Sequence, residues 1–96
     1  AGYKEIANGN ITAEALEKVG KIEEAIIEYE KLVEMKVDTP FTYRRLAILY
    51  RKNKQEKNEI RIINEALSNI PESNSKHYEW FKNRLQKMKS PRLFFK

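Results

Sequence analysis

The segment YRRLAILYRKNKQEKNEIRIINEALSNIP, residues 43–71, decides the fold, because apolar residues recur at helical spacing on both sides of a short polar turn. The apolar positions are Tyr43, Leu46, Ala47 and Tyr50 before the turn, and Ile60, Ile63, Leu67 and Ile70 after it. Spacings of three and four residues place such side chains on one face of an amphipathic helix. The turn, residues 53–57, is so short that the two helices must run antiparallel. The segment therefore predicts a helical hairpin.

A similar hairpin is predicted earlier in the chain. An offset of 34 positions superimposes Ala13 on Ala47 and Ile26 on Ile60. Self-similarity at a fixed period of this length indicates that one structural unit occurs more than once. We predict five helices in all, over residues 12–19, 21–36, 40–52, 56–70 and 75–89.

Residues with special backbone preferences set the expected helix ends. Asn8-Gly9 is expected to keep the first helix short, and Gly20 to end it in the left-handed conformation. Pro40 suits the first position of the third helix, with Thr39 as its cap. In the last helix, a register slipped by one residue from the strict repeat gives the better apolar face, made of Tyr78, Phe81, Leu85 and Met88. Trp80 then lies off this face.

Length and composition narrow the class of protein. The chain has 96 residues, which predicts a single small domain, residues 1–96. It contains no cysteine, which excludes disulfides and thiolate metal sites and fits a cytoplasmic protein. Glycine and proline are scarce, at three each, which favours helices over a β architecture. The longest apolar run, Leu46–Tyr50, is far shorter than the roughly 18 residues of a membrane-spanning helix.

The two hairpins resemble the tetratricopeptide repeat (TPR) family. The matching residues are Tyr43, Leu46, Ala47, Tyr50, Ala66 and Pro71 in the second hairpin, and Gly20, Ala25 and Tyr29 in the first. The resemblance implies about two and a half degenerate repeats, over residues 6–39, 40–73 and a partial 74–96, stacked as a short all-α solenoid. Lys54 stands where a turn glycine is usual, and Glu59 where the family has a small residue.

The resemblance also implies where a ligand would bind, because the first helix of each TPR unit lines a concave groove. The expected ligand is a protein or peptide of acidic character. The residues expected to face it are Phe41, Arg44, Ile48, Arg51 and Lys52. The alternative is that these are solvated side chains on an exposed face. The family's Lys–Asn–Arg clamp for a terminal carboxylate is absent, since Ile48 stands where the asparagine would be. A non-catalytic scaffold or adaptor module is therefore the expected function.

Two other functions compete with this one. The basic stretch 44–61 could meet nucleic-acid phosphates, although Glu56 and Glu59 are interspersed in it. Residues 1–40 hold five lysines and nine acids, a net −4, whereas residues 41–96 hold fourteen basic residues and five acids, a net +9. A structural oligomerisation module is the third reading, with Trp80, Leu93, Phe94 and Phe95 as contacts of a homodimer. The same tail could instead cover the last helix within one chain.

Catalysis is not expected, nor is a metal or cofactor. His77 is the only histidine, and a metal site needs several converging ligands. The sequence contains no glycine-rich phosphate loop and no nucleophile elbow.

Overall fold

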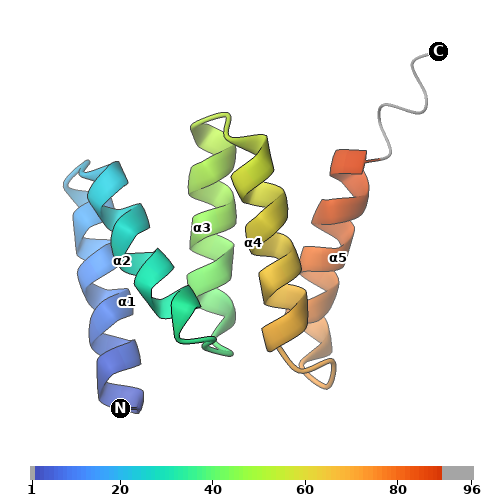
Figure 1. Cartoon of the computed structure of the whole chain (residues 1–96), viewed down its shortest axis with the longest axis horizontal. Helices are drawn as coiled ribbons and strands as arrows, with labels where there is room; N and C mark the ends of the chain where they lie inside the picture. The colour runs from blue at the N-terminus through green and yellow to red at the C-terminus, as the bar shows by residue number, and fades with distance from the viewer. Residues whose placement is uncertain (1, 90–96) are drawn as a thin grey trace.

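The computed structural model describes residues 2–89, and this part of the chain forms five α-helices and no strand (Figure 1). The helices are α1 (Tyr3–Lys18), α2 (Ile22–Glu34), α3 (Pro40–Lys52), α4 (Glu56–Asn69) and α5 (Ser75–Lys89). The all-α prediction with five helices is confirmed. The tail residues Leu93, Phe94 and Phe95 lie outside the described residues, so the prediction made for them stays a prediction.

The helices follow one another in a row, and each runs antiparallel to the one before it (Figure 1). The closest neighbours are the hairpin partners α1 with α2 and α3 with α4, while α2 also packs on α3 and α4 on α5. Short connections produce this order, because a loop of a few residues can only return the chain beside the helix it has just left.

The prediction that Asn8-Gly9 keeps the first helix short is wrong, because α1 runs through both residues. Tertiary packing explains this. A Cβ atom at Gly9 would lie only 2.9 Å from Leu32 Cδ2, so the glycine gives Leu32 room against α1. The next residue, Asn10, accepts a hydrogen bond of 2.8 Å from the buried Thr42 hydroxyl on α3. These contacts offset the helix penalty of glycine, about 1 kcal/mol relative to alanine.

The core contains the apolar faces predicted from the two hairpins with one exception on α4, where Ile62 is fully buried and the predicted Ile60 is not part of the core. Tyr29 and Leu46 are fully buried, as is Phe81 on α5. Leu85 and Met88 pack against the same core, which agrees with the slipped register. Trp80, off the predicted face, packs in part against the same core, and the prediction that it contacts a second chain stays a prediction. An aromatic ring as large as indole can reach the core from the edge of a helix face.

The two hairpin turns end α1 and α3 in the same way. Gly20 has φ 86° and follows α1 as predicted, while Lys54 has φ 59° after α3. In each turn two backbone hydrogen bonds close over the left-handed residue: Gly20 N to Glu17 O and Lys21 N to Leu16 O, then Lys54 N to Arg51 O and Gln55 N to Tyr50 O. This is the Schellman arrangement. Thr39 sits at the cap position of α3, but its side chain makes no capping hydrogen bond.

Lys54→Gly is therefore expected to stabilise the fold, by about 0.5–1 kcal/mol, because it removes the Cβ clash of a left-handed residue. The measurement is the free energy of unfolding in urea. The matched control is Lys82→Gly, at an exposed position in the middle of α5, which should destabilise by about 1 kcal/mol. A loss of stability in Lys54→Gly would contradict the role given to this turn.

No helix within residues 2–89 has the length and apolar character that crossing a membrane requires.

Candidate functional site

A surface pocket of about 440 Å³ lies along the first turns of α3. Its walls are Thr39, Pro40, Phe41, Arg44, Arg45, Ile48 and His77. We call it the α3 pocket. Three of the five residues predicted to face a ligand, Phe41, Arg44 and Ile48, line this pocket together. Arg51 and Lys52 do not line it.

The apolar part of the α3 pocket is held by contacts with neighbouring helices. Phe41 packs edge-on against Tyr29 of α2, with ring centroids 6.2 Å apart, and keeps 37% of its surface exposed. Ile48, two turns further along α3, is half-buried. His77 comes from the first turn of α5 and forms the opposite wall.

Arg44 supplies the positive charge of the α3 pocket. Its guanidinium carbon lies 4.8 Å from the centroid of the Trp80 ring, a cation–π contact. Among the described residues, Arg44 is not one of the arginines that pair with a carboxylate. It is therefore oriented by an aromatic ring while its hydrogen-bond donors stay available to a ligand.

The neighbouring arginines belong to three carboxylate clusters, each of which joins three consecutive helices. In the first, Glu17 of α1 accepts hydrogen bonds from the Tyr29 hydroxyl of α2, at 2.6 Å, and from Arg45 of α3, at 3.1 and 2.5 Å. Arg45 thus meets the carboxylate through two nitrogens, the strongest geometry for this pair.

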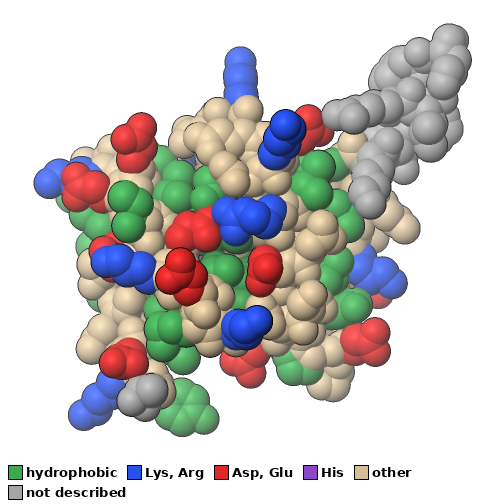
Figure 2. Space-filling view, in the orientation of Figure 1, with side chains coloured by type: hydrophobic (Ala, Val, Ile, Leu, Met, Phe, Trp, Pro, Cys, Tyr) green, Lys and Arg blue, Asp and Glu red, His purple; other side chains and the backbone are tan. Residues whose placement is uncertain are grey.

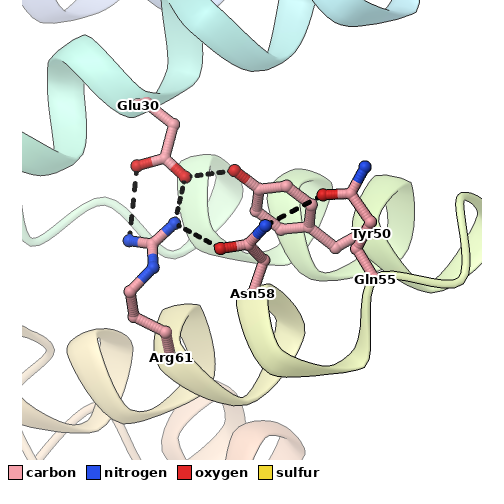
Figure 3. A network of polar contacts seen from close by, with 5 residues as sticks. All are labelled: Glu30, Tyr50, Gln55, Asn58 and Arg61. Atoms are coloured by element: carbon pink, nitrogen blue, oxygen red, sulfur yellow. Dashed lines mark hydrogen bonds and ion pairs between the residues drawn. The ribbon is translucent and has the colours of Figure 1, made fainter.

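The second cluster is centred on Glu30 of α2 (Figure 3). Glu30 accepts hydrogen bonds from the Tyr50 hydroxyl of α3 and from two nitrogens of Arg61 of α4, the shorter at 2.6 Å. Asn58 orients the same guanidinium from the preceding turn of α4, and Gln55 in turn accepts from Asn58 (Figure 3).

The third cluster is the most buried. Glu59 of α4, with 3% of its side chain exposed, contacts Arg51 of α3 at 3.0 Å and Arg84 of α5 at 2.9 Å. Glu59 occupies the position where the TPR pattern has a small residue. The negative charge of this buried side chain is compensated by two cations, Arg51 and Arg84.

These clusters reduce the number of cations in the basic stretch 44–61 that are available to bind phosphates. Arg45, Arg51 and Arg61 each pair with a glutamate. The remaining predicted phosphate contacts are Arg44, which stacks on Trp80, and three exposed lysines, Lys52, Lys54 and Lys57. On the face shown in Figure 2, acidic and basic side chains are interspersed with no one-signed patch. This arrangement disfavours a continuous phosphate track.

The clusters also shift pKa values. Burial raises the pKa of Glu17, but hydrogen bonds from Arg45 and Tyr29 outweigh it, so that the pKa of this carboxyl lies below its usual value. Burial, followed by the hydrogen bond to a glutamate, raises the pKa values of Tyr29 and Tyr50 well above the usual value of tyrosine. Both tyrosines therefore stay neutral donors in the folded state.

Glu17 is accordingly expected to make stability depend on acid pH. Because its pKa is lowered by folding, its contribution is fully present above about pH 5 and is lost as the pH falls below about 4. Glu17→Gln should reduce stability at neutral pH by about 1–2 kcal/mol and flatten the loss of stability below about pH 4. The measurement is thermal unfolding from pH 3 to pH 7. An acid slope identical to that of the original chain would contradict the role of Glu17.

Sequence reasoning missed the buried pair of Glu59 and Arg84. The signal was present in part, since an acid stood at a small-residue position, but nothing in the spacing pointed to a partner 25 positions away. Within residues 2–89, no group of three or more metal-ligating side chains comes together.

No protein-family model matches the chain, and no curated protein or solved structure matches it either. The TPR resemblance therefore stays a prediction.

Proposed function

We propose that this chain is a non-catalytic, TPR-like module that binds a protein or peptide through the α3 pocket. The α3 pocket itself carries the proposal, because it combines an apolar wall, Phe41 and Ile48, with a cation that pairs with no carboxylate in the described chain, Arg44. A side chain with an apolar body next to an acidic group would fit both features. The solenoid stacking of the helices and a cytoplasmic location belong to the same proposal.

The size and position of the pocket support a peptide ligand. Its volume, about 440 Å³, falls within the range of sites that hold small ligands or a few side chains. Its walls come from α3 and, through His77, from α5, so an extended peptide that crosses α3 can reach α5. The neighbouring cations steer an acidic segment toward the site.

The test uses peptides selected from a displayed random library against the intact chain and then synthesised. Ile48→Glu is expected to weaken their binding at least about 10-fold, because a carboxylate in the pocket removes apolar contact and repels an acidic ligand. The matched control is Ile27→Glu, which changes an isoleucine that is 56% exposed on α2, outside the pocket. Affinity is measured by isothermal titration calorimetry.

Helical circular dichroism should be the same for both variants and the original chain. Equal affinity of the selected peptides for Ile48→Glu and the original chain would refute the α3 pocket as the binding site. Loss of affinity in Ile27→Glu alone would move the site to α2.

A further inference from the structure

A second, smaller pocket lies between α3 and α5, next to the α3 pocket. It has a volume of about 270 Å³ and is lined by Arg51, Trp80, Asn83, Arg84 and Lys87. We call it the α5 pocket. Three of its five lining residues are cations, and none is an acid. Its volume is below that of pockets that enclose a whole small molecule, so it suits a single functional group.

Two guanidinium groups in the α5 pocket are fixed by one buried atom. Arg51 and Arg84 both contact Glu59 Oε2 through their Nε atoms, at 3.0 and 2.9 Å. No hydrogen bond in residues 2–89 uses the terminal Nη atoms of either arginine. Glu59 therefore holds two arginines side by side while their terminal donors stay available, and a guanidinium presents such donors in a planar fork that matches an oxyanion.

The charges around the α5 pocket are not balanced. Four cations, Arg44, Arg51, Arg84 and Lys87, lie around Trp80, and within residues 2–89 the carboxylate that pairs with Arg51 and Arg84 is that of Glu59. Burial lowers the pKa of Arg84, and so do the charges of Arg51 and Arg44, while Glu59 only partly offsets them. An anion bound beside Arg84 would relieve this repulsion.

We propose that the α5 pocket binds the phosphate group of a phosphorylated side chain on a peptide partner. The proposal rests on the proposed function and deepens it, since it assigns a chemical class to the ligand. A phosphate monoester carries nearly two negative charges at neutral pH and three acceptor oxygens, and it forms bidentate bonds with arginine. Arg44 links the two pockets, because it lines the α3 pocket and stacks on Trp80 of the α5 pocket. One peptide can therefore occupy both.

A peptide is a better source of the phosphate than a nucleic acid. A nucleic acid presents phosphates at regular intervals, and binding it needs cations in a corresponding row. Two further arginines of the basic stretch, Arg45 and Arg61, are already bound in two-nitrogen contacts to Glu17 and Glu30. The guanidinium groups of Arg44, Arg51 and Arg84 instead gather around Trp80, which matches an isolated phosphate.

Trp80 gives a direct readout, because it is the only tryptophan of the chain and lies in the pocket. Its fluorescence is followed during titration with a short alanine–glycine peptide, capped at both ends, with phosphoserine at its centre. We expect a saturable change, and at least about 10-fold weaker binding of the unphosphorylated peptide. Inorganic phosphate and a single-stranded oligonucleotide are titrated separately, at constant ionic strength.

Variants locate the response. Arg51→Gln combined with Lys87→Gln should weaken phosphopeptide binding at least about 10-fold, while Arg84 keeps its contact with Glu59. If the double variant is less stable than the original chain, Lys87→Gln alone is measured instead, because it changes only one exposed side chain. It should weaken phosphopeptide binding by a smaller factor. The matched control is Lys82→Gln, an exposed lysine of α5 that does not line the pocket, and it should bind as the original chain does.

Several outcomes would overturn the proposal. These are no saturable response to the phosphopeptide, equal affinity for inorganic phosphate or the oligonucleotide, or no effect of the pocket variants. The two proposals fail separately, because Ile48→Glu should leave the fluorescence response to inorganic phosphate unchanged. If the selected peptides bind Ile48→Glu more weakly but bind equally well with and without phosphate, the α3 pocket is supported as the peptide site and the α5 pocket is refuted as a phosphate site.

Discussion

Glu59→Ala is expected to lower the free energy of unfolding by about 3–5 kcal/mol, because it removes the carboxylate of a buried ion pair. The Glu59 side chain is 3% exposed and its partner Arg84 is 16% exposed. Without the carboxylate, Arg84 would remain as a buried cation with Arg51 and Arg44 nearby and no counter-charge. Truncation would also leave a cavity between α4 and α5. Urea unfolding followed by circular dichroism measures the loss.

A second substitution separates charge from packing. Arg84→Met in the Glu59→Ala background should recover part of the lost stability, because the unpaired buried charge is then gone. Arg84→Met alone should destabilise, since it leaves Glu59 with Arg51 only. If Glu59→Ala unfolds within about 0.5 kcal/mol of the original chain, the cluster contributes little and the two guanidiniums of the α5 pocket are not held by it.

The helices could be predicted from sequence because apolar periodicity depends only on local geometry. Spacings of three and four fixed α3 and α4 almost to the residue, and Pro40 marked the start of α3. The extension of α1 through Asn8-Gly9 could not be predicted in this way. It depends on Leu32 and Thr42, which lie on other helices and are brought to α1 only by the fold.

The offset of 34 positions adds a physical reason for the glycine. It superimposes Gly9 on Tyr43 and Leu32 on Ala66. The second hairpin thus has a large residue where the first has none, and a small one where the first has a leucine. Exchanging large and small positions conserves volume, which cores tolerate well. A search for compensating pairs between the repeats would have found this signal.

The candidate site was predicted in part. Phe41, Arg44 and Ile48 share a helix face, and a face can be calculated from sequence. Which cation stays available could not be calculated, because that depends on partners from other helices. Arg51 was expected beside Arg44 in one groove, but it pairs with Glu59 and lines the α5 pocket together with Arg84. Long charged side chains reach several neighbours, so their partners follow from the fold alone.

Leu46→Ala is expected to cost about 2–5 kcal/mol of unfolding free energy. Leu46 is fully buried in the middle of α3, the helix that packs on both α2 and α4. Removing its side chain would leave a cavity that these helices can close only in part, since other core residues such as Tyr29 and Ile63 are themselves fully buried and cannot move in without losing contacts. Ile27→Ala, at an exposed position of α2, is the matched control and should change stability by less than about 0.5 kcal/mol. Equal unfolding midpoints for Leu46→Ala and Ile27→Ala would mean that α3 does not form the centre of the core. Since α3 also carries the wall of the α3 pocket, the same variant should lose affinity for the selected peptides only in proportion to its unfolded fraction.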